Sequence, residues 1–403
     1  MTCLCTPGPT RRAADYPAEF LPLQSLAAGR KAAAEIAAWP GFAATPLHDL
    51  KGLAATAGLG SVYYKDEGGR FGLGSFKALG GAYAVFRLLQ DRIAEATGTA
   101  PDSITGTDLI AGRHAQIVRD ITVTCATDGN HGRSVAWGAS LFGCRCVIYI
   151  HALVSDGRRD AIAAYGAEVV RTAGNYDDSV RQAQADAGRN GWFVVSDTSY
   201  PGYENVPRNV MQGYGVMAAE ALAQCPAPPT HIFVQGGVGG LAAAVLAHAW
   251  EKLEAGCPRF VVVEPDRADC LRRSAEAGHP VAVTGDLDTI MAGLACGEVS
   301  LIAWKILAAG ADAFMAVDDD SAAALMRRLA TPAAGDPPVV AGESAVAGLA
   351  GALAAAADPA LAARLALGPQ SRVLVFGTEG ATDPALYQQI VGRSATAVLQ
   401  TRA

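Results

Sequence analysis

Short runs of apolar and β-branched residues recur along the chain, separated by longer alanine-rich stretches with helical spacing. Most of the short runs are continuously apolar rather than alternating, which is typical of strands buried on both faces of a parallel sheet. The predicted strands are Ser61–Lys65, Ile121–Thr124, Cys146–Ile150, Glu168–Arg171, Phe193–Val195, His231–Val234, Phe260–Val263 and Arg372–Phe376.

Helices are predicted between these strands, for example at Gly132–Phe142, Arg158–Tyr165, Asp177–Ala187, Gly240–Leu253 and Ser321–Leu329. The alternation of strands and helices predicts an α/β fold with largely parallel sheets. Two segments lack such periodicity. We expect Thr97–Gln116 to be an inserted loop and Thr331–Pro338 to be a connector.

Composition narrows the class of protein. The 403 residues suffice for two or three domains, and 51% hydrophobic against 18% charged residues predicts a large core. A net charge of −7 without a long basic run argues against nucleic acid as a partner. The first twenty residues lack the apolar segment of a secretory signal, so we expect a cytoplasmic protein.

The most apolar stretch, Val339–Ala357, is built mainly of alanine and glycine and is interrupted by Glu343. It predicts a loop followed by a buried helix, and no membrane span. The nine cysteines lack the spacing of a zinc site. We therefore expect no bound metal, and reduced thiols as in a cytosolic protein.

A glycine-rich loop follows one predicted strand and opens an apolar helix. Its residues are Gly236, Gly237, Val238, Gly239 and Gly240. Backbone N–H groups can converge on an anion there, and the helix dipole favours negative charge. The loop lacks the G-K-[ST] ending of a nucleotide-binding loop, so a phosphate monoester fits it better than a triphosphate. The alternative is a tight turn whose glycines serve packing alone.

Two further segments carry candidate chemistry. Lys77 follows Ser75-Phe76 at a predicted helix start, where apolar neighbours can lower the pKa of an amine and make it a nucleophile. The alternative is a surface lysine. The turn Thr127–Gly132 contains Asp128, which can accept a proton, and Asn130, which can donate a hydrogen bond to a phenolate. The alternative there is a loop with a helix cap.

Together these segments resemble the fold-type II enzymes that use pyridoxal 5′-phosphate, the group of threonine dehydratase and the tryptophan synthase β-subunit. The resemblance is closest to the diaminopropionate ammonia-lyase family and spans about residues 40 to 385. The motifs that carry it are Arg70–Lys77, Ala126–Arg133, Asp197-Thr198, Met211–Tyr214, Thr289–Glu298 and Thr378–Gly380.

The resemblance implies two open, largely parallel sheets flanked by helices, with the cofactor between two domains. We expect a large domain of residues 1–88 and 215–403 and a small domain of residues 89–214, in a homodimer. The implied reaction is elimination from D- and L-2,3-diaminopropionate, by way of an aminoacrylate, to pyruvate and two ammonia molecules.

The resemblance also implies residue roles. Lys77 would carry the cofactor as a Schiff base, and Asn130 would contact its 3′-oxygen. Asp128 and Asp197 would remove the Cα proton from the D- and L-substrate, respectively. The glycine-rich loop would hold the phosphate. The ring nitrogen would be met by Thr378 or by the adjacent Glu379, and Glu343 would either lie near the ring or cap a helix.

Two other functions stay open at this stage. One is a dehydratase of serine, threonine or hydroxyaspartate on the same fold, and the other is a catalytically silent protein that binds the cofactor. The sequence further suggests that Cys270 and Cys296 border the same cleft and lie close together, either bridged or as separate thiols.

Overall fold

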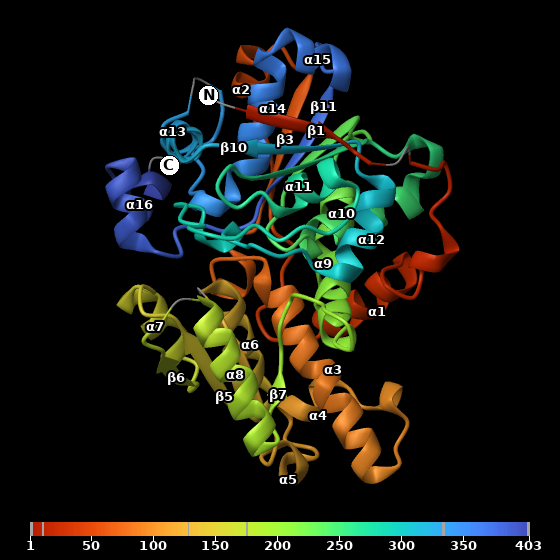
Figure 1. Cartoon of the computed structure of the whole chain (residues 1–403), viewed down its shortest axis with the longest axis vertical. Helices are drawn as coiled ribbons and strands as arrows, with labels where there is room; N and C mark the ends of the chain where they lie inside the picture. Colours follow the sequence, from red (N-terminus) through yellow and green to blue (C-terminus); the bar gives the residue numbers. More distant parts are fainter. Residues whose placement is uncertain (1–2, 10–11, 128, 175, 333–334, 401–403) are drawn as a thin grey trace. The chain divides into compact units, whose positions relative to one another are not determined.

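The computed structural model describes residues 3–9, 12–127, 129–174, 176–332 and 335–400 (Figure 1). The chain forms two compact units, each built around its own sheet. Unit 1 comprises Met1–Leu26, Ala44–Ser75 and Met217–Ala403, and unit 2 comprises Ala27–Ala43 and Phe76–Val216.

Unit 1 contains a seven-stranded sheet in the order β1-β10-β9-β8-β11-β3-β2. The five inner strands run parallel, and the edge strands β1 and β2 are antiparallel to their neighbours. The strands are β1 Cys3–Pro7, β2 Leu47–Asp49, β3 Ser61–Asp66, β8 His231–Gln235, β9 Arg259–Pro265, β10 Ala313–Val317 and β11 Arg372–Gly377.

Helices cover this sheet. They are α2 Lys51–Thr56, α10 Gly240–Leu253, α11 Cys270–Ala277, α12 Leu301–Gly310, α13 Asp319–Ala330, α14 Ala347–Ala357, α15 Pro359–Leu365, α16 Pro384–Val391 and α17 Ala395–Gln400. Short 3₁₀ helices are η1 Ala18–Phe20, η2 Arg70–Gly72, η4 Glu254–Gly256, η5 Ala292–Leu294 and η6 Glu343–Ala345. The helix α9, Asn205–Gln224, runs across the boundary between the units.

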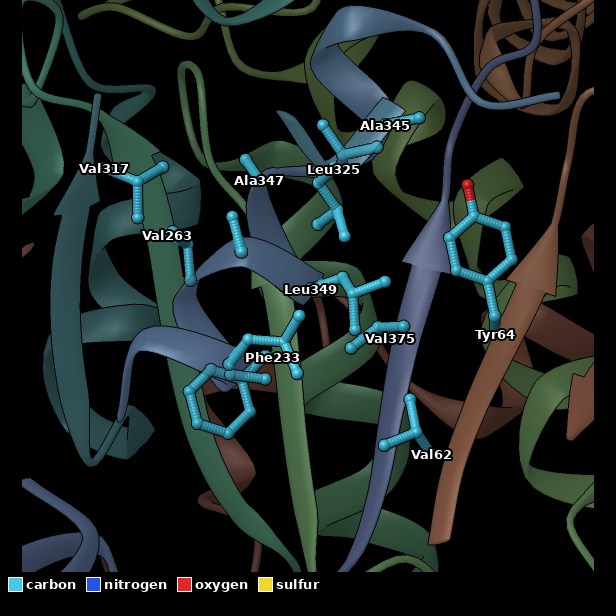
Figure 2. Close-up of a cluster of buried hydrophobic side chains, with 14 of the residues drawn as sticks. Val62, Tyr64, Phe233, Val263, Val317, Leu325, Ala345, Ala347, Leu349 and Val375 are labelled. Carbon is cyan, nitrogen blue, oxygen red and sulfur yellow. The ribbon is translucent and has the colours of Figure 1, made fainter. Parts of the chain in front are cut away.

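The core of unit 1 lies between the parallel strands and α14. Figure 2 shows Phe233 of β8 and Val375 of β11 beside Leu349 of α14, all fully buried or nearly so. Continuously apolar strands and an alanine-rich helix form this layer because both faces of the strands are excluded from water. The predicted loop and buried helix within Val339–Ala357 are confirmed as η6 and α14.

Unit 2 contains a four-stranded parallel sheet in the order β6-β5-β4-β7. Its strands are β4 Thr122–Ala126, β5 Arg145–Ile150, β6 Glu168–Arg171 and β7 Phe193–Val194. Its helices are α1 Leu26–Ile36, α3 Lys77–Thr97, η3 Pro101–Ser103, α4 Gly106–Ile110, α5 Ala115–Val118, α6 Asn130–Phe142, α7 Asp156–Ala163 and α8 Tyr176–Asn190.

Each sheet has one point at which the direction of strand addition reverses. In unit 2 the chain leaves β4 toward β5 and returns to β7 on the other side of β4. In unit 1 it leaves β8 toward β9 and returns to β11 on the other side of β8. Ligands of open α/β sheets bind at the carboxyl ends of strands at such points. The fold therefore predicts ligand-binding residues after β4 and β7 in unit 2, and after β8 and β11 in unit 1.

All eight predicted strands and all five predicted helices are present, with ends shifted by up to three residues. The strands β1, β2 and β10 were not predicted. Two of them are antiparallel edge strands, and β10 is an alanine-containing run that follows α12 closely. The prediction of a loop at Thr97–Gln116 was wrong, because the segment contains η3 and α4. Thr105 and Asp108 form a capping box that starts α4 without any long apolar repeat.

The boundaries of the two units differ from those expected from the sequence. The first lies after Ser75, rather than at residue 88, because α3 continues unbroken from Lys77 to Thr97. The N-terminal segment Ala27–Ala43 also belongs to unit 2. There Glu35 accepts hydrogen bonds from the Trp39 indole and from the Gly106 backbone, which ties this segment to α4. None of the described helices is long and apolar enough to cross a membrane.

Candidate active site

Lys77 is the first residue of α3, in unit 2. Its Nζ atom lies 2.5 Å from Oδ2 of Asp197, and each side chain is 19% exposed. The rings of Phe76 and Tyr214 lie 5.6 and 6.0 Å from the same nitrogen. Lys77 is thus an ion-paired amine with aromatic neighbours, and the alternative of a freely solvated surface lysine is excluded.

Asp197 lies just beyond β7, at the reversal point of the smaller sheet. The Tyr203 hydroxyl fixes this segment, because it donates to the Val194 carbonyl at 2.8 Å and accepts from the Ser196 N–H at 3.0 Å. Burial acts to raise the pKa of Asp197, but the Lys77 ammonium and His131 outweigh it and lower the pKa. The carboxylate is therefore ionised at neutral pH and available as a base.

His131 faces the same carboxylate from α6. Its Nε2 lies 2.7 Å from the Val195 carbonyl oxygen, and its Nδ1 lies 3.9 Å from Asp197 Oδ2. A carbonyl only accepts, so Nε2 must carry the proton. Burial lowers the pKa of His131, and the charge of Asp197 partly opposes this effect. Among the described residues, this Nδ1 has no hydrogen-bond partner.

Close helix packing holds these elements together within unit 2. A Cβ on Gly81 of α3 would lie 1.9 Å from Ser134 Oγ of α6, so only glycine fits there. Asn130 is the first residue of α6, two residues before the predicted helix start at Gly132. Thr127 Oγ1 shapes the turn before it by accepting from the Gly129 and Gly132 N–H groups, both at 3.1 Å. Asp128, the other predicted base, lies outside the described residues.

The glycine-rich loop lies at the other reversal point, between β8 and α10 of unit 1. A Cβ on Gly236 would lie 2.6 Å from Leu271 Cδ1, and Gly239 has a φ of +98°. Val238 is held by its carbonyl, which accepts from the Ser300 N–H at 2.8 Å. The first turn of α10 has no side-chain cap, so its N–H groups are left for an anion.

Thr378 follows β11, next to this loop across the reversal point. Its Oγ1 lies 2.6 Å from Nε2 of Gln235, the last residue of β8. Glu379 is engaged elsewhere, since its carboxylate accepts from the Ser344 N–H at 3.0 Å and from the Thr382 hydroxyl at 3.3 Å. The Thr378 hydroxyl therefore lies at the carboxyl end of the sheet, whereas the Glu379 carboxylate is directed toward Ser344 and Thr382. Glu343 is buried at the start of η6.

Cys270 and Cys296 both contact Gly237. The Cys270 thiol lies 3.6 Å from the Gly237 carbonyl oxygen, and Cys296 Sγ would lie 3.1 Å from a Cβ at Gly237. Both residues thus border Gly237 of the glycine-rich loop, and neither forms a disulfide. Burial raises the pKa of Cys270 well above its ordinary value, so this thiol is protonated.

Sequence reasoning placed Lys77 and Asp197 in one site without any signal of their contact, and the structure brings them together in unit 2. Gln235 and His131 received no role from the sequence. The only sequence feature that could have indicated a role for them was their position: His131 lies within the Thr127–Gly132 turn, and Gln235 directly precedes the glycine-rich loop. Among the described residues, no group of three His, Cys, Asp or Glu side chains could hold a metal ion.

These residues fit pyridoxal phosphate. Within unit 2, a primary amine lies beside an ionised carboxylate, as attachment of the cofactor requires. Within unit 1, an uncapped, glycine-lined helix N-terminus can bind a phosphate. A family model described as pyridoxal-phosphate dependent enzyme matches residues 38–379. The chain belongs to this family.

Individual relatives narrow the comparison. The diaminopropionate ammonia-lyase of Salmonella typhimurium is 42% identical over 369 residues, covering 88% of this chain and 90% of that protein. The Escherichia coli K12 enzyme of the same name is 40% identical over 367 residues, or 89% of each chain. The crystal structure of the holo enzyme from Escherichia coli has a TM-score of 0.88 at 36% identity over 97% of both chains.

A second Escherichia coli structure of this enzyme, in complex with an aminoacrylate-PLP azomethine reaction intermediate, has a TM-score of 0.85 at 37% identity and covers 97% of both chains. Threonine deaminase isoform 2 of Solanum lycopersicum shares the fold, with a TM-score of 0.70 at 19% identity over 96% of this chain and 97% of that one. The predicted fold class, a fold-type II α/β enzyme, is confirmed.

Proposed function

We propose that this protein is a carbon–nitrogen lyase that converts 2,3-diaminopropionate and one water to pyruvate and two ammonia molecules. The single observation that carries the proposal is the ionised Asp197 carboxylate 2.5 Å from Lys77 Nζ. An amine able to hold the cofactor and a base able to remove a proton from Cα thus share one hydrogen bond. The 42% identity to a diaminopropionate ammonia-lyase supports the choice of substrate.

Each candidate residue has a task in this reaction. Pyridoxal phosphate, held through Lys77 Nζ, would supply the electron-withdrawing ring that stabilises negative charge at the substrate Cα. Gly236, Gly237, Val238, Gly239 and Gly240 would hold its phosphate through backbone N–H groups. Asn130 would donate to its 3′-oxygen, and Thr378 would meet its ring nitrogen.

Asp197 is the proposed base for the L-enantiomer. In the free protein the Lys77 ammonium lowers the pKa of this carboxyl against the effect of burial. Whenever Lys77 is neutral, the largest influence that lowers the pKa of Asp197 is lost, and the carboxylate becomes a stronger base. Lys77 Nζ and Asp197 can also exchange a proton directly across their hydrogen bond. Asp128 is proposed as the base for the D-enantiomer on the family resemblance alone.

The ratio of products tests the proposal. The purified holoenzyme is supplied with D- or L-2,3-diaminopropionate, and ammonia and pyruvate are measured together. We expect two ammonia per pyruvate, whereas serine as substrate would give one. Turnover of serine, threonine or hydroxyaspartate without turnover of the diamine would establish a dehydratase. Cofactor bound through Lys77 without any turnover would establish a catalytically silent protein.

The family resemblance supports two further parts of the proposal, a homodimer and a cytoplasmic location. None of the eight cysteines whose side chains the structure describes forms a disulfide, which suits a reducing compartment. Sedimentation of the holoenzyme tests the dimer, and cell fractionation tests the location.

A further inference from the structure

Gln235 is a buried polar residue at the end of β8, next to the glycine-rich loop, and its side chain is 1% exposed. Its Nε2 lies 2.6 Å from Thr378 Oγ1 and 2.8 Å from the Phe376 carbonyl oxygen, while the Ala345 carbonyl oxygen is 3.4 Å away. The side chain thus spans the reversal point of the large sheet, from β8 to the segment after β11.

The orientation of this amide follows from its neighbours. The carbonyl oxygens of Phe376 and Ala345 can only accept hydrogen bonds, so the NH₂ group of Gln235 must face them. The opposite side of the amide lies against Gly348, where a Cβ would come within 3.2 Å of Gln235 Oε1. The short contact to Thr378 is therefore a donation from Gln235, and Thr378 Oγ1 is the acceptor.

A hydroxyl that accepts from a fixed donor must direct its own proton elsewhere. Gln235 also occupies one lone pair of the Phe376 carbonyl oxygen at 2.8 Å, which weakens this carbonyl as a competing acceptor for the Thr378 proton. The proton of Thr378 is consequently available to a ligand at the carboxyl end of the sheet. A donor matches the lone pair of an unprotonated ring nitrogen, whereas a carboxylate such as Glu379 would match a protonated one.

We propose that Gln235 is a positioning residue that makes Thr378 a hydrogen-bond donor, so that the ring nitrogen of the cofactor is held unprotonated. The inference rests on the proposed function, because it assumes that Thr378 meets that nitrogen. An unprotonated ring withdraws less charge from the substrate. Loss of the β-amine is then favoured over return of the proton to the cofactor, which would give transamination.

The experiment uses pyridoxal phosphate labelled with ¹⁵N at the ring and nuclear magnetic resonance of the holoenzyme at neutral pH. We expect the chemical shift of an unprotonated pyridine in the unmodified protein. In Gln235→Met, which keeps the length of the side chain but not the donor, the Thr378 hydroxyl is free to turn toward the Phe376 carbonyl. The ¹⁵N shift should then move toward the protonated form, and cofactor affinity should fall about tenfold.

Matched variants complete the design. Thr378→Asp supplies the reference shift of a protonated nitrogen, and Gln389→Met, at an exposed glutamine of α16, should leave shift and affinity unchanged. Transaminated cofactor should accumulate per turnover at least several times faster in Gln235→Met. A protonated ring nitrogen in the unmodified protein overturns the inference even if no variant folds, as does an unchanged shift in Gln235→Met. If borohydride reduction does not attach the cofactor covalently to Lys77, the proposed function itself is wrong.

Discussion

Nζ of Lys77 lies 2.5 Å from Oδ2 of Asp197, and His131 Nδ1 faces the same oxygen at 3.9 Å. The carboxylate is mostly buried, so its charge depends on these two neighbours. Removing either neighbour should change both the basicity of Asp197 and the stability of unit 2.

Lys77→Ala is expected to abolish turnover and covalent cofactor binding. It should also destabilise the cofactor-free protein at neutral pH, because Asp197 is left as a buried charge without its partner. Breaking a buried pair costs about 3–5 kcal/mol, and partial exposure puts this pair at the lower end. The double variant Lys77→Ala/Asp197→Asn should recover most of the loss in urea unfolding. No recovery would mean that Lys77 stabilises the fold by packing alone.

The stability of the cofactor-free protein should depend on pH through the same pair. The folded-state pKa of Asp197 is lowered below the unfolded value of about 3.9. The pair therefore contributes its full stability above that unfolded value, and the contribution is lost as the pH falls toward the folded pKa. Unfolding of the unmodified protein and Lys77→Ala from pH 7 to pH 3 should show a difference that shrinks on acidification. A constant difference would contradict the assignment.

Asp197→Asn should damage turnover of L-2,3-diaminopropionate about 10²–10⁴-fold, the usual cost of losing a general base. Asp128→Asn should chiefly damage turnover of the D-enantiomer. Steady-state kinetics with each enantiomer separates the two effects. Equal losses on both enantiomers in both variants would exclude a division of labour between the carboxylates.

His131→Phe is expected to lower kcat for the L-substrate about 10²-fold with little change in KM, because the ring no longer holds Val195 and the segment carrying Asp197. His131→Gln offers an amide donor to the same carbonyl and should recover part of kcat. If Gln and Phe at this position behave alike, the hydrogen bond to Val195 has no bearing on catalysis.

Gly239→Ala should weaken pyridoxal phosphate binding to the cofactor-free protein, because a residue with a Cβ is strained by about 1–2 kcal/mol at a φ of +98°. The control is Gly256→Ala in η4, where nothing lies within 4 Å of an added Cβ. Titration followed by absorbance gives both dissociation constants. Equal affinities in the two variants would argue that the loop does not bind the phosphate.

The buried charge cluster of unit 1 provides a stability test away from the reaction. Glu220 accepts from Lys65 at 2.7 Å and from Arg70 at 2.6 Å, and both cations are fully buried or nearly so. Glu220→Gln should therefore cost about 3 kcal/mol or more in urea unfolding. Asp102→Asn, which removes an exposed pair with Lys31, should cost less than about 1 kcal/mol. Comparable costs would contradict the cluster's role.

Apart from β10, the inner strands of both sheets were predictable, because a continuous β-branched run such as Phe260–Val263 forms a buried strand more readily than any other element. The edge strand β2 was not, since two of its three residues, His48 and Asp49, are polar and the strand is ordered by pairing with β3. Short motifs located Lys77 and the glycine-rich loop. Pairings across the fold, such as Gln235 with Thr378, join residues 143 positions apart and leave no periodic trace in the sequence.

The reversal of strand order described for the two sheets also bears on how such a protein can change over time. In unit 2 the segments that we propose to be catalytic adjoin β4 and β7, whereas β6 lies at the far edge of the sheet. A strand–helix module gained or lost beyond β6 would leave the hydrogen bonds between β4 and β7 intact. We therefore expect that this outer edge can be lengthened, trimmed or used for peptide grafts without disturbing the pairing of β4 with β7.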